Sequence, residues 1–412
     1  MQNSLRQNSR PDSPGGNESP EDSFRLVQIN LQSHFGGGEV YTAFLCRALS
    51  QLGLPTRLLV NAHATFWDRL ELPADTERIA VANASGLQQH LPAGPLWLLS
   101  HGPLPIELRA VMPDRLRTAI AHMPVQGRDP AAFADHDRIY AVSGWVRDGL
   151  RAAGLPAWNQ PLYGVADIGP RRESPDAQHE GSRAGNDDIH RTSRYDWDQH
   201  KNRDRLLGLL EPLAETLRAH PPFERRPGLT LGIVSRLTPI KQFPLLFSHL
   251  APVLARHREV NLEVFGSGGY ASVRDLDRAL AALPSGQVRF WGQQDNVAAI
   301  YRQLDYLLSG LPEKEALGLN IIEAQVCGTP VIAVNAPPFT ETVVNGETGF
   351  LYDDPRRDSG AAFGRLLDQL LAGRARPQPE LAQAHLARFS FDAFVERLRP
   401  VVADAESHVS RE

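Results

Sequence analysis

The sequence predicts an α/β protein built from two doubly wound parallel sheets. Short apolar runs alternate with amphipathic stretches, which is typical of βα units that assemble into parallel sheets. The apolar runs form two series, and a polar segment that begins at Ile168 separates them. The 412 residues are enough for two domains of ordinary size, each with its own core. We therefore expect two sheets in two domains and not one continuous sheet.

The apolar runs that we expect to form strands can be named one by one. In the first half of the chain they are Phe24–Leu31, Thr56–Asn61, Leu96–Ser100, Arg117–His122 and Arg138–Ser143. In the second half they are Leu229–Ser235, Asn261–Gly266, Val288–Gly292, Asp305–Ser309 and Pro330–Val334. The clearest helix of the first half is Glu39–Leu52, where apolar side chains recur near helical spacing.

Shifts in composition divide the chain into segments. The expected segments are a polar, disordered tail over 1–22, a first domain over 23–167, a linker or insertion over 168–226, a second domain over 227–390 and an amphipathic C-terminal segment over 391–412. The tail lacks the apolar core of a signal peptide. The insertion begins with many charged and small residues, so we expect it to be partly disordered, with a helix over Leu206–Leu217.

Composition and charge limit the functional classes. The net charge is −5 and the pI is near 6.3, which argues against a nucleic-acid partner. The cysteines Cys46 and Cys327 show neither zinc spacing nor a disulfide framework, so they fit small buried residues in a reducing compartment. No apolar run reaches the roughly 18 residues of a membrane-spanning helix. We therefore expect a cytoplasmic protein.

The most informative segment runs from Glu315 to Glu323 and sets two carboxylates eight positions apart. A glycine-containing turn lies between them and opens a helix. The start of a helix presents unpaired N–H groups and partial positive charge, which suit a phosphate. Glu323 follows about two turns later, where a carboxylate can accept hydrogen bonds from sugar hydroxyls. A helix start that suits a phosphate, with a carboxylate that suits sugar hydroxyls beside it, indicates a nucleotide-sugar site.

This segment resembles the Glu-x7-Glu signature of retaining glycosyltransferases with the GT-B fold, especially glycosyltransferase family 4. Gly318, Ala324, Gly328 and Pro330 match its flanks, whereas two glutamates at this spacing alone are most often solvated faces of a helix. The resemblance covers about Phe24 to Asp354. It implies two Rossmann-like domains that face each other across a cleft, with a C-terminal helix that crosses back to the first domain.

A second motif, Arg236-Leu-Thr-Pro-Ile-Lys241, follows directly after an apolar strand. Arginine offers planar bidentate donors and lysine a compact cation, and both suit phosphate oxygens. The motif resembles the family's Arg-Leu-x-x-x-Lys segment, which implies that Arg236 and Lys241 hold the diphosphate. A surface turn that happens to carry basic residues is the alternative.

Two glycine-rich turns follow strands. The turn Gly36–Glu39 opens the first helix, and its glycines let the backbone approach a ligand closely. Its spacing is not the Gly-x-Gly-x-x-Gly of a nicotinamide site, so that hypothesis loses ground. The family has a similar loop between its domains. The other turn, Gly266–Gly269, resembles the glycine turn in the family's second domain, and it could equally be a plain tight turn.

Two histidines, His101 and His122, lie at strand ends. The family often has a histidine at each of these places, and the later one typically points at the donor sugar. The resemblance therefore favours His122 beside the reacting sugar. A lone histidine is often a satisfied structural residue, and that alternative stays open.

An Asp-x-Asp pair, Asp196 and Asp198, is the metal ligand set of a different glycosyltransferase fold. In this chain no strand leads into the pair, so we interpret it as a solvated or capping segment. Arg236 and Lys241 supply the positive charge that a metal would otherwise bring. We expect no metal and no cofactor besides the nucleotide-diphosphate sugar that serves as donor substrate.

The resemblance implies a retaining, metal-independent glycosyltransferase that moves a sugar from a nucleotide-diphosphate sugar to a hydroxyl of a glycan, glycolipid or other acceptor, in polysaccharide or glycoconjugate biosynthesis. The residues that it implies in catalysis are His122, Glu315, Arg236 and Lys241. The residues that it implies in donor binding are Gly37, Gly38, Arg236, Lys241, Gly266, Gly318, Leu319 and Glu323. Glu315 would lie near the transferred sugar and Glu323 on the ribose.

Other functions stay open. A sugar-nucleotide epimerase or phosphorylase would use a similar fold, and so would a catalytically silent binding subunit. The presence of both glutamates and both cations counts against the silent subunit. Peripheral contact with the inner face of the membrane is a further hypothesis, based on a loose basic set in the first domain. Its members are Arg109, Arg115, Arg117 and Arg128, for which solvated surface arginines are the alternative.

Overall fold

The computed structural model describes residues 26–109, 115–166, 189–197 and 222–409. The expected tail over 1–22, the expected helix at Leu206–Leu217 and Asp198 all lie outside the described residues.

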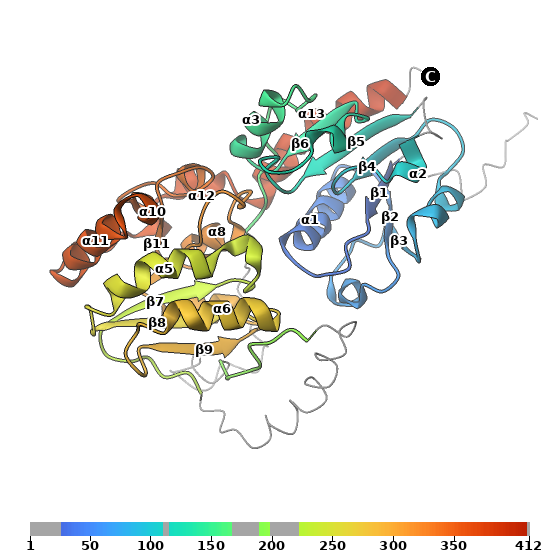
Figure 1. Ribbon diagram of the computed structural model, residues 1–412. Coiled ribbons are helices and arrows are strands. Elements are labelled where there is room, and N and C mark those ends of the chain that lie inside the picture. Colours follow the sequence, from blue (N-terminus) through green and yellow to red (C-terminus); the bar gives the residue numbers. More distant parts are fainter. Residues whose placement is uncertain (1–25, 110–114, 167–188, 198–221, 410–412) are drawn as a thin grey trace, which may run out of the picture.

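Each half of the chain forms a six-stranded sheet in which all neighbouring strands are parallel (Figure 1). The first sheet contains β1 (Leu26–Asn30), β2 (Thr56–Asn61), β3 (Thr76–Val81), β4 (Trp97–Ser100), β5 (Leu116–Ala121) and β6 (Arg138–Ala141). The second contains β7 (Leu229–Val234), β8 (Val260–Phe265), β9 (Val288–Gly292), β10 (Tyr306–Leu308), β11 (Val331–Val334) and β12 (Gly349–Tyr352). The prediction of two doubly wound sheets is confirmed.

Helices connect the strands. The α-helices are α1 (Gly37–Gln51), α2 (Ile106–Arg109), α3 (Gly144–Ala152), α5 (Phe243–Leu254), α6 (Tyr270–Leu280), α7 (Val297–Gln303), α8 (Leu319–Val326), α9 (Phe339–Thr342), α10 (Pro355–Asp358), α11 (Ala361–Leu371), α12 (Gln383–Ala387) and α13 (Phe391–Val409). The 3-10 helices are η2 (Thr65–Arg69), η3 (Ala84–Gly86), η4 (Gln88–His90), η5 (Pro130–Phe133), η7 (Pro239–Lys241) and η8 (Pro379–Leu381).

The strand order places one candidate binding edge in each domain. The first sheet has the order β3-β2-β1-β4-β5-β6 and the second the order β12-β11-β10-β7-β8-β9. Each sheet therefore reverses its winding direction between its first and fourth strands. In open α/β sheets ligands bind outside the carboxyl ends of the strands at this reversal. The reversal lies between β1 and β4 in the first sheet and between β7 and β10 in the second.

The last helix, α13, packs on the first domain although it follows the second domain in sequence (Figure 1). Its side chains Phe394, Leu398 and Val402 belong to the same buried cluster as residues of α1. The ring of Phe394 meets Tyr41 of α1 edge-on, with ring centroids 5.5 Å apart. The apolar stripe of α13 is therefore buried against α1, so the helix that follows the second domain packs on the first domain.

Two strands, β3 and β12, are missing from the expected set, and both lie at sheet edges. β3 has the sequence Thr-Glu-Arg-Ile-Ala-Val and is mostly exposed, so it lacks the apolar run of a central strand. β12 begins at Gly349, whose neighbourhood indicates a turn. The backbone of Val331 lies so close to Gly349 that a Cβ atom would contact its carbonyl oxygen, so glycine is required for this pairing.

Candidate functional site

The four charged residues that the sequence singled out lie on elements that meet at the reversal point of the second sheet, and two of them, Lys241 and Glu315, are in direct contact. Arg236 and Lys241 lie in the loop after β7, and Glu315 lies in the loop between β10 and α8. Glu323 follows in the second turn of α8. The amide of Asn320 donates to the carbonyl of Val234 over 3.1 Å, which fixes the start of α8 against the end of β7. Residues that are 87 positions apart in sequence, from Arg236 to Glu323, thus share one edge of the sheet.

Lys241 and Glu315 form an ion pair at this edge. Lys241 Nζ donates to Glu315 Oε2 over 2.5 Å, and both side chains are largely but not fully buried. Glu315 Oε1 accepts a weaker hydrogen bond from the backbone N–H of Ala316 at 3.3 Å. A charge-assisted hydrogen bond of this length orients the ammonium group and holds it beside the start of α8.

Helix α8 begins at Leu319, directly after a residue in the left-handed region. Gly318 has φ +84°, which a residue with a side chain rarely adopts. No side chain caps the first turn of α8, and the N–H of Ile321 donates to the carbonyl of Gly318 over 3.0 Å, which leaves the N–H groups of Leu319 and Asn320 without a partner among the described residues. The expected glycine turn before this helix is therefore present, with Lys241 and Glu315 beside it, and its binding of a phosphate stays a prediction.

Glu323 lies further along α8 and is only partly exposed. Its Oε2 accepts a hydrogen bond from the hydroxyl of Tyr301 at 2.9 Å. Burial raises the pKa of Glu323, and the hydrogen bond from Tyr301 and the charge of Lys241 oppose that rise. Within the described residues Glu323 Oε1 has no hydrogen-bond partner, so one oxygen stays open to a hydroxyl donor.

The glycine turn after β8 lies against the loop that carries Arg236. Gly266 has φ +136°, and a Cβ atom there would stand 2.0 Å from the carbonyl oxygen of Ser235. The N–H of Leu237 donates to the carbonyl of Ser267 over 2.8 Å. A larger residue at 266 would displace the loop after β7, so this glycine shapes the backbone under Arg236.

Arg236 connects the two domains. Its Nη1 donates to the carbonyl of Phe35 in the first domain over 2.6 Å. A Cβ atom on Gly36 would lie 2.9 Å from the same nitrogen, which shows how closely the guanidinium approaches the glycine loop. Leu319 at the start of α8 reaches the same loop, because a Cβ atom on Gly37 would lie 3.5 Å from its Cδ1. The glycine loop of the first domain thus borders the charged cluster of the second.

The two histidines at the strand ends of the first sheet are direct neighbours. His101 Nδ1 lies 3.0 Å from His122 Nε2, and the rings are nearly parallel. His101 is buried, whereas His122 is partly exposed and lies beneath Gly38 of the glycine loop. Burial lowers the pKa of His122 to about 4 and that of His101 well below its usual value. Both imidazoles are therefore neutral at physiological pH, and His122 is the one closer to the glycine loop.

Glu341 joins the two domains through a contact that the sequence did not indicate. Its carboxylate accepts from the backbone N–H groups of Gly144 at 2.8 Å and Trp145 at 2.6 Å, at the start of α3. The hydroxyl of Tyr163 donates to the same carboxylate at 3.2 Å. Glu341 lies in the second domain and α3 in the first, so the carboxylate caps a helix about 200 positions away. Local sequence carries no signal for such a partner.

Asp196 of the Asp-x-Asp pair contacts the glycine turn of the second domain. Its Oδ1 accepts from the hydroxyl of Ser267 at 2.5 Å, and its backbone N–H donates to the carbonyl of Gly268 at 2.9 Å. The short segment 189–197 therefore lies against the edge of the second sheet. Asp196 binds a turn in the structure, as expected of a capping segment.

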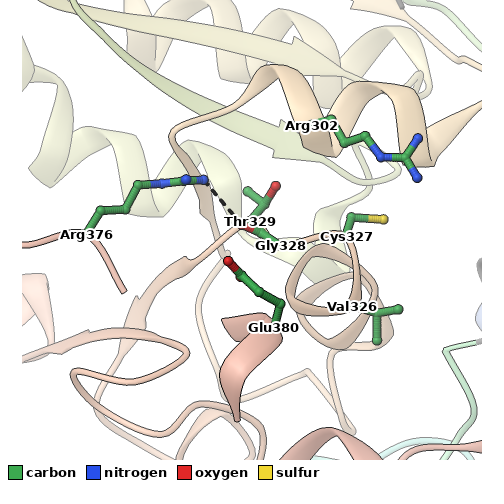
Figure 2. A pocket seen from close by; sticks show the side chains of 7 residues that line it. All are labelled: Arg302, Val326, Cys327, Gly328, Thr329, Arg376 and Glu380. Carbon is green, nitrogen blue, oxygen red and sulfur yellow. Dashed lines mark hydrogen bonds between the residues drawn. The ribbon is translucent and has the colours of Figure 1, made fainter. Parts of the chain in front are cut away.

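A separate hollow of about 520 Å³ lies at the opposite end of α8 (Figure 2). Its lining residues are Arg302, Val326, Cys327, Gly328, Thr329, Arg376 and Glu380. Arg376 donates to the carbonyl of Gly328 over 3.3 Å across this hollow. The end of a helix presents carbonyl groups with partial negative charge, which disfavour a phosphate. We therefore place the candidate site at the start of α8, beside Lys241, and not in this hollow.

The loose basic set of the first domain is partly neutralised. Arg109 pairs with Asp135 at 3.3 Å, and Arg117 pairs with Asp137 at the same distance. Paired arginines offer less charge to an anionic lipid surface than free ones. Among the described residues, none of the helices has the length and apolarity needed to cross a membrane.

Comparison with known proteins agrees with this geometry. Residues 221–383 match the family model of glycosyl transferases group 1. A D-inositol 3-phosphate glycosyltransferase from Rhodococcus opacus is 33% identical over 207 residues, which cover 45% of this chain and 45% of that protein. A D-inositol 3-phosphate glycosyltransferase from Acidothermus cellulolyticus is 28% identical over 406 residues, covering 90% of this chain and 86% of that protein. The alignments with the Rhodococcus opacus and Rhodococcus jostii proteins thus span less than half of their length.

The fold has solved counterparts. The crystal structure of Anabaena HepE in complex with UDP superposes with a TM-score of 0.63 at 15% identity, over 92% of this chain and 100% of that chain. Two doubly wound domains with their reversal points brought together by interdomain contacts define the GT-B architecture. The family-model match in the second domain, the relatives and the shared fold together support a GT-B glycosyltransferase of the group 1 type.

Proposed function

We propose that this protein transfers a sugar from a nucleoside diphosphate sugar to a hydroxyl group, with retention of anomeric configuration and without a metal ion. The observation that carries the proposal is the cluster at the reversal point of the second sheet. It combines the Lys241–Glu315 ion pair, the exposed Arg236 and the uncapped start of α8. Cations and helix N–H groups at one point suit a leaving diphosphate.

The leaving diphosphate sets the largest electrostatic demand of such a reaction. The bond between the anomeric carbon and the diphosphate oxygen breaks, and negative charge develops on that oxygen. Arg236 and Lys241 would stabilise it, as fixed donors do for other developing oxyanions. These two cations are our reason to propose chemistry without a metal ion.

Retention follows if the acceptor hydroxyl attacks the face from which the diphosphate departs. The acceptor oxygen then bonds to the anomeric carbon, and its proton passes to a phosphate oxygen of the leaving group. No protein nucleophile is needed in this scheme. Glu315 would hold Lys241 beside the diphosphate and contact the transferred sugar, and Glu323 would accept from the ribose hydroxyls through its open Oε1.

The first domain would supply the acceptor side. The partly exposed His122 lies next to the glycine loop that borders Arg236 and Leu319. A neutral imidazole at this place suits a sugar hydroxyl better than a phosphate, because it brings no positive charge. The acceptor would therefore approach between His122 and the charged cluster.

Thermal shift with nucleotides tests the donor site. We expect UDP, GDP or ADP to raise the melting temperature, since a ligand that binds only the folded state stabilises it. UDP comes first because HepE contains it. The shift should persist in EDTA and vanish in Arg236→Ala. The matched control is Arg128→Ala, which removes an exposed arginine of the first domain. An equal shift in Arg236→Ala would contradict the assigned phosphate site.

Turnover with and without an acceptor tests the reaction. D-inositol 3-phosphate is the first acceptor to try because the relatives carry that name. We expect nucleotide release that depends on the acceptor and a product with the donor's anomeric configuration by NMR. Donor isomerisation without an acceptor would support an epimerase instead. Phosphate-dependent cleavage would support a phosphorylase, and nucleotide binding with no reaction a binding subunit.

A further inference from the structure

A chain of buried polar groups leads from the centre of the first sheet to His122. Gln28 of β1 is fully buried, and its Oε1 lies 3.0 Å from His101 Nε2. Its amide nitrogen donates to Cys46 Sγ over 3.4 Å. His101 in turn lies 3.0 Å from His122. Gln28 lies in β1, Cys46 lies in α1, and the two histidines directly follow the ends of β4 and β5, so their contact is a product of the fold.

The proton positions in this series of hydrogen-bonded side chains follow from which atoms can donate and which can only accept. The amide oxygen of Gln28 can only accept, so His101 carries its proton on Nε2. A neutral imidazole has one N–H group, and therefore His101 Nδ1 is an acceptor. Burial lowers the pKa of both histidines, which keeps each ring at one proton.

Thr42 does not supply the proton that His101 Nδ1 accepts. Its hydroxyl lies 3.1 Å from this nitrogen but donates to the carbonyl of Gly38 over 2.9 Å. The amide nitrogen of Asn30 donates to the Thr42 oxygen at 2.9 Å, which leaves the hydroxyl hydrogen free for Gly38. His122 Nε2 remains as the donor to His101. His122 must then carry an unprotonated Nδ1.

We propose that Gln28 and His101 are positioning residues that hold His122 in the Nε2–H tautomer, so that His122 Nδ1 accepts a hydrogen bond from a sugar hydroxyl. The identity of that hydroxyl donor rests on the proposed function. Within the described residues His122 Nδ1 has no hydrogen-bond partner, and it lies on the side of Gly38. An acceptor nitrogen selects a neutral hydroxyl and repels a phosphate or carboxylate oxygen.

NMR of the ligand-free full chain tests the tautomer directly. Long-range nitrogen–proton correlation spectra of histidine distinguish a protonated ring nitrogen from an unprotonated one. We expect His122 in the wild type to show a protonated Nε2 and an unprotonated Nδ1, and His101 to show the same pattern. A protonated His122 Nδ1 would overturn the proposal.

Two variants at Gln28 separate tautomer control from packing. Gln28→Glu, read at a pH high enough to keep the carboxylate ionised and His101 neutral, keeps an acceptor beside His101 Nε2 and should preserve both tautomers. Gln28→Leu removes the acceptor, so His122 should become a mixture of the two tautomers. An unchanged His122 spectrum in Gln28→Leu would overturn the role of Gln28. If Gln28→Leu does not fold, the wild-type and Gln28→Glu spectra still test the proposal. A changed tautomer of His101 or His122 in Gln28→Glu would contradict it.

Turnover supplies a second readout. With UDP-glucose as the probe, we expect Gln28→Leu to lower kcat several-fold and to leave the affinity for UDP unchanged, whereas Gln28→Glu retains activity. A loss of UDP affinity equal to the loss of kcat would indicate a merely structural role and count against the proposal. Absence of nucleotide binding by the wild type would overturn the proposed function alone. The tautomer spectra are read without nucleotide, so the two failures are distinguishable.

Discussion

The second sheet carries charge at its carboxyl end, whereas the first sheet carries neutral histidines there. Both sheets have the same strand order, and both reverse their winding between the first and fourth strands. The loops of the second sheet present Arg236 and the Lys241–Glu315 pair. The first sheet presents His101 and His122, whose pKa values burial lowers.

One topology can thus carry two kinds of side chain at its carboxyl edge. In our proposal the exposed cations of the second sheet bind phosphate through charge, and that binding should weaken with salt. The neutral histidines of the first sheet would bind hydroxyls through the direction of their hydrogen bonds. The proposed division of the substrate therefore depends on which side chains end each strand, and not on the sheets themselves.

The largest expected effect is a loss of turnover when Lys241, in the charged cluster of the second sheet, is replaced. Lys241→Ala removes a cation that we propose stabilises the leaving diphosphate, and it leaves Glu315 without its ion-pair partner. We expect kcat/KM to fall by about 10²–10³-fold, as when one fixed oxyanion donor is removed. Steady-state kinetics against the nucleotide sugar that stabilises the wild type measures the loss. A decrease below tenfold would place the diphosphate elsewhere, and Arg128→Ala should change nothing.

A smaller effect is expected on the neutral side. His122→Ala removes the proposed hydrogen-bond partner of a sugar hydroxyl but no charge. We expect kcat to fall about tenfold, which corresponds to about 1.4 kcal/mol of transition-state free energy. The dissociation constant of UDP should stay the same, and calorimetric titration measures it. If UDP binding weakens as much as turnover, the first sheet contributes to diphosphate binding, which contradicts our assignment of the diphosphate to the second sheet alone.

The contact that joins the two sides contributes to stability. Glu341→Ala removes the carboxylate that caps α3 across the domain boundary. The loss of a helix cap costs about 1 kcal/mol, so the midpoint of urea unfolding should decrease. Glu341→Gln keeps one acceptor oxygen and should lose less. An unchanged midpoint in Glu341→Ala would show that solvent replaces the cap without cost.

The last expected effect is a pH dependence of stability from the neutral side. The folded-state pKa of His122 is about 4, below its ordinary value of 6.5. Between these values the unfolded chain binds more protons than the folded one, so His122 favours folding above pH 6.5 and loses this contribution as the pH falls toward 4. Melting temperatures between pH 7 and 4.5 should therefore decrease less in His122→Asn than in the wild type. An equal decrease in melting temperature for both proteins over this pH range would show that His122 is not held neutral.

Much of the fold could be predicted from local patterns. All ten expected strands are present, and eight of them are central strands, which are buried on both faces and read as apolar runs. Of the two missed edge strands, β3 is mostly exposed and lacks an apolar run, whereas β12 is buried but begins at Gly349, in a segment that reads as a turn. The glycines of the turns were also readable. Gly318 and Gly266 adopt backbone conformations that other residues avoid.

The candidate site was predicted as a set of residues and not as a set of contacts. Arg236, Lys241, Glu315 and Glu323 were named from their motifs, and the structure gathers them at one edge. Their individual roles stay predictions. The ion pair between Lys241 and Glu315 could not be predicted, because it depends on how the loops after β7 and β10 meet.

The two sheets and the two phosphate-type motifs could be recognised in the sequence, since each depends on neighbours within a few turns of chain, and the class of site stays a prediction. Which distant groups touch became known from the tertiary structure. It placed Arg236 against Phe35, Glu341 against α3 and Gln28 behind His101. Such contacts depend on directions and distances between elements, which side-chain spacing along a chain does not encode.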